Sequence, residues 1–166
     1  MNLQNHYWYF QSVIPPKVCD DIVRYANSIK DQIGVTGRFG DKKLNDSDIS
    51  DLKRERNSNI VWLYDKWIYR EIHPYVHRAN ENAGWNFEWD WSEACQFTKY
   101  GKGQYYDWHC DSFHAPYQRS DQNDPSHGKI RKLSVTVSLS DPKDYKGGEL
   151  EFDFKDVHVN QKPNIK

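Results

Sequence analysis

Two stretches in the first half of the chain carry apolar residues at helical spacing. In the first, Lys17–Ile33, they recur every three or four positions: Val18, Ile22, Ala26, Ile29 and Ile33. This repeat predicts an amphipathic helix that starts after Pro15 and Pro16. The second repeat predicts a helix over Asp65–Ala83, which Pro74 should kink or split. The polar, glycine-containing segment between them, Gly34–Asn59, is expected to be a long loop.

After Gly84 the apolar period changes from helical spacing to strict alternation. Trp85–Trp91 alternates large rings with polar residues, and Leu133, Val135, Val137 and Leu139 alternate with hydroxyl residues. Alternation of this kind predicts strands with one buried face. The expected strands are 85–91, 93–100, 104–111, 129–140, 149–154 and 157–159. Because the helices come first and the strands follow, we expect an α+β or mainly β fold rather than alternating βαβ units.

Composition narrows the class of protein. The chain has 166 residues and a formal net charge of −1, which suits one domain and argues against nucleic-acid or anionic-membrane partners. No run approaches the roughly 20 apolar residues of a membrane span. Three cysteines without CxxC spacing imply neither a disulfide framework nor a zinc site. We therefore expect a single, cytoplasmic domain at 1–166.

The clearest chemical signal is the tripeptide His109-Cys110-Asp111. On a strand, residues two apart share one face, so the imidazole and the carboxylate would project together while Cys110 points away. A histidine and a carboxylate are two of the three ligands in the facial triad of non-haem Fe(II) enzymes. Taken alone, however, the tripeptide is far more typical of an exposed pair on a strand than of a metal site.

Other candidate groups leave their alternatives open. His73 and His77 are four residues apart, which is compatible with a metal, but surface histidines are the simpler interpretation. His114 and His127 lie in the polar connection 112–128, where histidines are usually solvated. A row of hydroxyls would suit a bound dicarboxylate or a solvent-facing strand: Ser134, Thr136 and Ser138.

Three motifs occur together, and their order is informative. The pattern Y-x-x-G-x-x-Y-x-x-H-x-D is carried by Tyr100, Gly103, Tyr106, His109 and Asp111. It is followed by the alternating segment Arg131–Ser140 and then by Tyr145–Phe152, which contains a glycine pair. Together they resemble the catalytic domain of prolyl 4-hydroxylase-like, 2-oxoglutarate- and Fe(II)-dependent dioxygenases. The resemblance extends from about Trp62 to Phe154.

The resemblance implies a role for five residues. His109 and Asp111 match the first two iron ligands of the family. Tyr106 matches a tyrosine near the iron that touches the substrate. Tyr100 and Ser134 match hydroxyl residues that hold a carboxylate of 2-oxoglutarate. These roles come from the resemblance and await the structure.

The resemblance also implies a fold and a reaction. The expected fold is a double-stranded β-helix (jelly-roll) with the N-terminal helices packed on one sheet. The expected cofactors and co-substrates are Fe(II), 2-oxoglutarate and O2, with ascorbate as a further expectation. The expected reaction is hydroxylation of a C–H bond, of a prolyl residue in a peptide or protein substrate, without nucleic-acid or membrane partners. Gly34–Asn59 could then act as a lid over that peptide.

One part of the family pattern is not recognisable. The family has a second histidine on a later strand, followed by a Lys or Arg that clamps 2-oxoglutarate. His158 lies 49 positions after His109, but it follows the glycine-pair strand too closely, and Lys162 and Lys166 depend on it. We therefore expect that the domain is truncated at its C-terminus. The alternative is an inactive jelly-roll that binds peptides and lacks a complete iron site, and a nucleic-acid demethylase is disfavoured by the charge balance.

Overall fold

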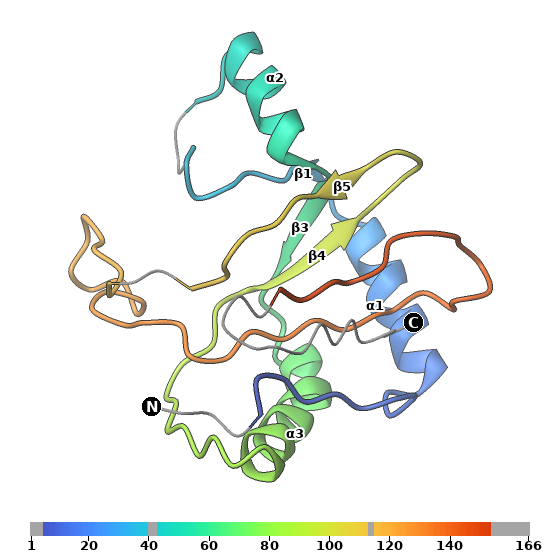
Figure 1. The fold of residues 1–166 in the computed structure, drawn as a ribbon, viewed down its shortest axis with the longest axis vertical. Helices are drawn as coiled ribbons and strands as arrows, with labels where there is room; N and C mark the ends of the chain where they lie inside the picture. Colours follow the sequence, from blue (N-terminus) through green and yellow to red (C-terminus); the bar gives the residue numbers. More distant parts are fainter. Residues whose placement is uncertain (1–4, 40–42, 113–114, 154–166) are drawn as a thin grey trace.

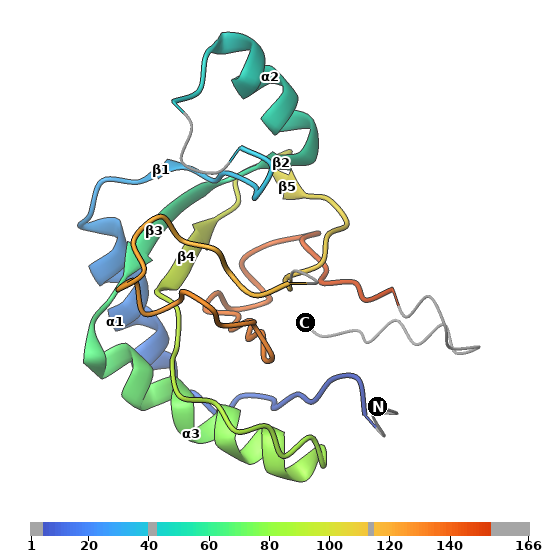
Figure 2. The ribbon, with the colours of Figure 1, turned by 90° about the vertical axis from the view of Figure 1, so that its left-hand side faces the viewer.

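The computed structural model describes residues 5–39, 43–112 and 115–153 (Figure 1). Within these residues the regular elements, in chain order, are α1 (Pro16–Asn27), β1 (Gln32–Ile33), α2 (Asp46–Glu55), β2 (Arg56–Asn57), β3 (Asn59–Leu63), α3 (Lys66–Asn82), β4 (Cys95–Lys99) and β5 (Tyr105–Tyr106). Helix α2 lies at one end of the molecule and α3 at the other, with the strands between them (Figures 1 and 2).

Helix α1 is shorter than its apolar repeat predicted. It begins at Pro16, in the first turn, where a missing N–H costs nothing. It ends at Asn27, and the Ser28 hydroxyl donates to the Tyr25 carbonyl at 2.6 Å. Asn and Ser compete with the helix by bonding to nearby backbone groups. Ile33 therefore belongs to β1 and not to the helix.

The expected loop 34–59 contains a helix and a strand, so that prediction was wrong over much of its length. Asn45 caps α2: its side chain accepts from the Asp48 N–H at 2.9 Å, and Asp48 accepts from the Asn45 N–H at 3.1 Å. Acidic residues in the first turn and basic residues in the last complement the helix dipole. Helix α2 leads directly into β2 at Arg56.

The core lies between a three-stranded sheet and the helices α1 and α3. The sheet has the order β1-β3-β4 and is antiparallel throughout. Its buried cluster consists of Ile22, Ala26, Val61, Leu63 and Ile68. Helix α3 runs through Pro74 as one element, so the predicted split does not occur.

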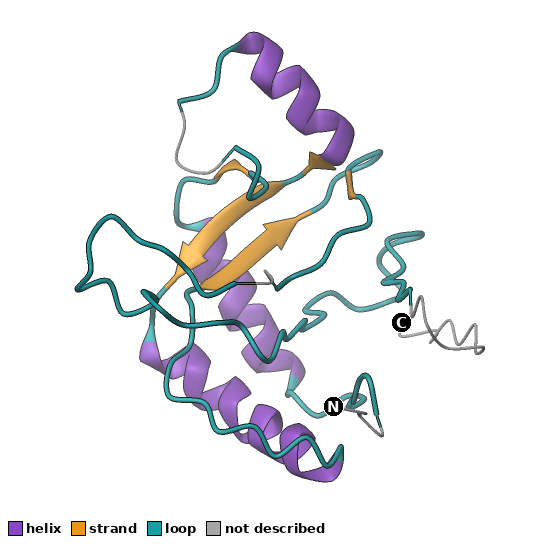
Figure 3. Ribbon diagram, turned by 60° about the vertical axis from the view of Figure 1, so that its left-hand side comes forward, coloured by secondary structure: helices purple, strands orange, loops and turns teal. Residues whose placement is uncertain are grey.

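Most of the strands expected in the second half are not strands in the structure. Strand β4 confirms the prediction for 93–100, but only 105–106 of the expected strand 104–111 forms a ladder. Segments 85–91, 129–140 and 149–153 have no ladder among the described residues and are drawn as loop in Figure 3. In 85–90 the alternation of burial is nevertheless present, with each ring half-buried and each polar neighbour exposed. A strand also needs a neighbouring strand that accepts and donates its backbone hydrogen bonds. The alternation of side chains does not specify that neighbour. The expected strand 157–159 lies outside the described residues.

The α+β class is confirmed, with both sheets antiparallel. Helices hold more of the described residues than strands do, so the expected dominance of strands is not met there. No helix among the described residues is both long and apolar enough to cross a membrane.

Candidate functional site

The site begins at the short ladder between β2 and β5. Arg56 is paired in register with Tyr106, and Asn57 with Tyr105. One further backbone bond extends this contact, because the Asp107 N–H donates to the Glu55 carbonyl at 2.9 Å. The Tyr105 hydroxyl also donates to the last turn of α2, at 3.0 Å from the Lys53 carbonyl oxygen. The segment before His109 is thus fixed to residues from the first half of the chain.

His109 and Asp111 meet although their backbone is not in a ladder. The chain turns at Asp107, whose carboxylate accepts from the Trp108 N–H at 2.8 Å. The His109 ring folds back so that Nδ1 lies 2.7 Å from the Asp107 carbonyl oxygen. Its Nε2 lies 3.2 Å from Asp111 Oδ1. Cys110 between them is exposed. The expected convergence of the two side chains is present, but a turn rather than a strand produces it.

This pair fits a metal ion in two respects. Two ligand atoms that bind one ion at about 2.1 Å and at right angles are about 3 Å apart, close to the observed separation of Nε2 and Oδ1. A carbonyl oxygen only accepts hydrogen bonds, so we assign the proton of neutral His109 to Nδ1, which leaves the Nε2 lone pair for a metal. Within the described residues no group of three or more His, Cys, Asp or Glu side chains is placed to hold a metal. His109 and Asp111 are therefore the two candidate metal ligands in the described part of the chain.

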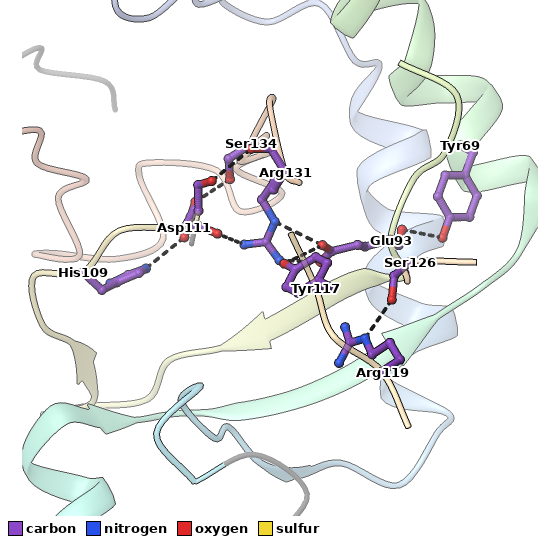
Figure 4. A network of polar contacts seen from close by, with 10 residues as sticks. Tyr69, Glu93, His109, Asp111, Tyr117, Arg119, Ser126, Arg131 and Ser134 are labelled. Atoms are coloured by element: carbon purple, nitrogen blue, oxygen red, sulfur yellow. Dashed lines mark hydrogen bonds and ion pairs between the residues drawn. The ribbon is translucent and has the colours of Figure 1, made fainter. Parts of the chain in front are cut away.

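Asp111 is held by two residues of the segment 129–140 (Figure 4). The Ser134 hydroxyl donates to Asp111 Oδ2, and an Arg131 guanidinium N–H donates to the Asp111 carbonyl oxygen. Oδ1 is then the carboxylate oxygen that faces His109. Hydrogen bonds of this kind orient a ligating carboxylate toward its metal.

Arg131 joins this site to Glu93, which precedes β4. Its Nε donates to Glu93 Oε1 at 3.2 Å, and a second N–H of the same guanidinium donates to Oε2. The Tyr117 hydroxyl donates to the same carboxylate at 3.0 Å. Burial pushes the pKa of Arg131 down, but the hydrogen bond to Glu93 and its charge outweigh burial and hold that pKa above its usual value. The guanidinium is therefore a permanent cation behind Asp111.

The two tyrosines of the motif have different surroundings. The Tyr106 ring stacks on the His109 ring, with centroids 3.6 Å apart and planes 13° apart. Burial raises the pKa of the Tyr106 phenol, and the negative charge of Asp111 raises it further. The positive charge of Arg56 acts in the opposite direction, and the net effect is a raised pKa. Tyr100 is 51% exposed and follows β4. Partial burial raises the pKa of the Tyr100 phenol, although the positive charge of Arg56 acts to lower it.

The structure thus brings four of the five predicted site residues into one chain of contacts: Tyr106, His109, Asp111 and Ser134. Tyr100 lies close enough to Arg56 for that charge to act on its phenol, but no contact joins it to those four. The family resemblance implies that Ser134 binds 2-oxoglutarate. In the structure its hydroxyl contacts Asp111, an expected iron ligand, so it can also position that carboxylate.

The remaining histidines do not extend the site. His73 and His77 both contact the indole of Trp89: the His73 ring is edge-on, with centroids 5.1 Å apart, and the His77 ring is stacked, with centroids 4.7 Å apart. His73 is also half-buried and paired with Ser92 at 3.1 Å, so it is not the simple surface histidine expected. His127 accepts from the Arg119 N–H at 3.1 Å within the connection 112–128. His114, His158, Lys162 and Lys166 lie outside the described residues.

Sequence reasoning missed the residues that support the site: Arg56, Glu93, Asp107 and Arg131. Arg56 stands in the run Lys53–Asn59, whose charges suggested a solvated loop. Arg131 begins the alternating segment. Nothing in the local sequence indicated that its partner would be Glu93, which lies 38 residues earlier in the chain. Asp107 lies in the middle of the expected strand 104–111, so its position gave no sign of a bend in the chain.

Comparison with known proteins agrees with this geometry. Residues 95–165 match the model of the 2OG-Fe(II) oxygenase superfamily. This matched segment covers less than half of the chain and contains all five predicted site residues, so the match agrees with the family resemblance that the motifs predicted. Its start at β4 lies later than the predicted start near Trp62. Searches of curated proteins and of solved structures found no match to the chain.

Proposed function

We propose that this protein is a dioxygenase that uses Fe(II) and 2-oxoglutarate to hydroxylate a C–H bond of a prolyl residue in a peptide or protein. The observation that supports it is the pair His109–Asp111, 3.2 Å apart, inside a segment of the 2OG-Fe(II) oxygenase superfamily. The family match supports a dioxygenase and does not favour the alternative of an inactive peptide-binding domain. The jelly-roll, the prolyl substrate and the use of ascorbate belong to this proposal and rest on the motif resemblance.

His109 Nε2 and Asp111 Oδ1 would hold the iron. Bound Fe(II) with 2-oxoglutarate would supply the oxidation of the C–H bond by O2, one oxygen atom going to the substrate as hydroxyl and the other to succinate, with loss of CO2. The protein supplies orientation. The Asp107 carbonyl fixes the imidazole tautomer, and Ser134 with Arg131 fixes the carboxylate.

The aromatic residues around this pair would orient the organic ligands. Tyr106 lies against the His109 ring, so a substrate at the iron would be beside its phenol. Tyr100 is the candidate partner for a 2-oxoglutarate carboxylate. Its hydroxyl donates only while the phenol is neutral, and its raised pKa favours that state at neutral pH. Trp108, 61% exposed and next to His109, offers an apolar surface for a peptide.

The proposal is tested by anaerobic titration of the protein with Fe(II) and 2-oxoglutarate, followed by admission of O2 with a proline-containing peptide. We expect a visible charge-transfer band for the iron complex of 2-oxoglutarate, and then a peptide heavier by one oxygen atom with succinate in equal amount. A band with succinate but no oxidised peptide would keep the oxygenase and reject the prolyl substrate. No band in a folded protein would reject the iron site itself.

A further inference from the structure

Arg56 is a buried cation next to the site, in strand β2. The residue is 3% exposed. Its Nε donates to the Ser58 hydroxyl at 2.9 Å, and its Nη1 donates to the Val35 carbonyl at 3.0 Å. Gly34 makes room for the side chain, because a Cβ there would lie 2.6 Å from Nε and 2.8 Å from Cζ. The surroundings of Arg56 thus fit the guanidinium closely.

The guanidinium lacks the partner that a buried charge usually has. Nη2 is buried without a hydrogen-bond acceptor, and no carboxylate pairs with Arg56 among the described residues. A buried charge without a compensating partner is costly. Its neighbour is an aromatic face: Cζ lies 4.4 Å from the centroid of the Tyr106 ring. The negative face of such a ring attracts a cation, and the attraction is stronger when the pair is desolvated.

Tyr106 in turn contacts the expected iron ligand. Its ring lies 3.6 Å from the His109 ring, at an angle of 13° between planes. Arg56 and Tyr106 are also paired in the β2–β5 ladder, so their side chains project from neighbouring points of the backbone. The Arg56 guanidinium thus contacts the Tyr106 ring, and the Tyr106 ring contacts the His109 imidazole. These two contacts link the first half of the chain to the site.

We propose that Arg56 is a positioning residue that holds the Tyr106 ring and, through it, the imidazole of His109. The hydrogen bond to the Asp107 carbonyl positions Nδ1 of the imidazole. The stacked Tyr106 ring restricts the tilt of the imidazole plane and so helps to keep Nε2 directed at Asp111. The functional meaning of this contact rests on the proposed iron site, but the contact itself exists in the metal-free protein and is tested there.

The first test uses NMR of the metal-free full chain. The His109 ring protons should be shifted upfield by the ring current of Tyr106 in the wild type. Arg56→Met, which keeps an unbranched apolar stem and removes the charge, should lose most of this shift, while Arg56→Lys should keep part of it. The matched control is Arg54→Met, since the Arg54 side chain is 79% exposed and pairs with Asp51 on α2. Wild-type ring protons without an upfield shift would overturn the proposal, even if Arg56→Met fails to fold.

The second test asks whether Arg56 acts through Tyr106. Co(II) serves as a spectroscopic probe of the metal site. Arg56→Met and Tyr106→Leu should each weaken Co(II) binding about tenfold, the range found when residues behind a ligand are removed. The double variant should bind no more weakly than Tyr106→Leu alone. Losses that multiply in the double variant, or unchanged affinity in a folded Arg56→Met protein, would contradict the proposed role.

The two tests also separate this inference from the proposed function. A wild-type protein that shows the His109 shift but binds no Co(II) would reject the iron site and retain the contact from Arg56 to His109. A protein that binds Co(II) and oxidises peptide, with ring protons that do not respond to Arg56, would retain the function and reject the positioning role.

Discussion

His109 Nε2 and Asp111 Oδ1 lie 3.2 Å apart, while the side chain of the residue between them, Cys110, is exposed. This convergence is produced by a turn at Asp107 and by the bonds that Ser134 and Arg131 make to Asp111. The site is therefore built by contacts from outside the tripeptide. Both side chains of the pair are exposed, at 37% and 47%, but Asp111 is held by contacts that an isolated pair on a strand would lack.

Removing either side chain of this pair should abolish metal binding. His109→Ala and Asp111→Ala each delete one of the two proposed protein ligands, so we expect at least a hundredfold loss of Co(II) affinity, measured by the visible spectrum of the bound ion. Cys110→Ser is the matched control, because it lies between the two ligands and should leave the spectrum unchanged. A spectrum that disappears only in Cys110→Ser would mean that the thiol binds the ion.

Ser134→Ala separates two roles for this hydroxyl. If Ser134 orients Asp111, as its hydrogen bond indicates, the variant should lose about tenfold in metal affinity before any 2-oxoglutarate is added. If Ser134 binds the co-substrate, as the family resemblance implies, metal affinity should stay constant and only the concentration of 2-oxoglutarate needed for the charge-transfer band should rise. Titrations with and without 2-oxoglutarate distinguish the two, with Ser138→Ala as the control on the same segment.

The residues of the site were predictable to the extent that their signals are local. The motif spacing selected Tyr106, His109 and Asp111, and these three are in contact. Helix α2 could also have been predicted, because Asn45 followed by Asp48 is a capping box at the sequence level. The charged residues around it favoured the interpretation as a solvated loop.

The contacts that link distant segments were not predictable. The alternation in 129–140 indicated that Leu133, Val137 and Leu139 would be half-buried, although Val135 is exposed. It could not specify a backbone partner, and no ladder forms there among the described residues. For the same reason the salt bridge from Arg131 to Glu93 has no sequence signal. Gly147 and Gly148 are different, because both have positive φ, 80° and 73°, a conformation that a glycine pair predicts from sequence.

Glu93→Gln should destabilise the fold and loosen the site together. Glu93 accepts from Arg131 and from Tyr117, and its loss leaves the Arg131 cation without its counter-charge. We expect a decrease of about 1–2 kcal/mol in the free energy of unfolding, measured in urea, since both side chains are about one-third exposed.

The control for Glu93→Gln is another carboxylate with two cationic partners. Asp21 pairs with Lys17 and Arg24 at 2.9 Å each, and both of these cations are far more exposed than Arg131. Asp21→Asn should therefore lower the free energy of unfolding by much less than Glu93→Gln does. Equal losses in the two variants would show that Glu93 contributes nothing beyond an exposed ion pair.

His73 should make the stability of the fold depend on pH. Burial lowers its pKa from the ordinary value of 6.5, and the neighbouring His77 acts in the same direction. The unfolded chain therefore binds a proton at this position more readily than the folded chain does. The contribution of His73 to stability is fully present above pH 6.5 and decreases as pH falls from 6.5 through the lowered folded pKa.

His73→Phe tests this dependence, because a phenyl ring keeps contact with Tyr69 and Trp89 but cannot take a proton. The free energy of unfolding would be measured in urea at about pH 8 and at about pH 5, on either side of the unfolded pKa. We expect the wild type to lose more stability over this interval than His73→Phe does, although the variant gives up the bond to Ser92 at both pH values. Ser92→Ala, which removes only that bond, should keep the wild-type slope. Parallel pH profiles for wild type and His73→Phe would show that His73 has the same pKa in the folded and unfolded chains.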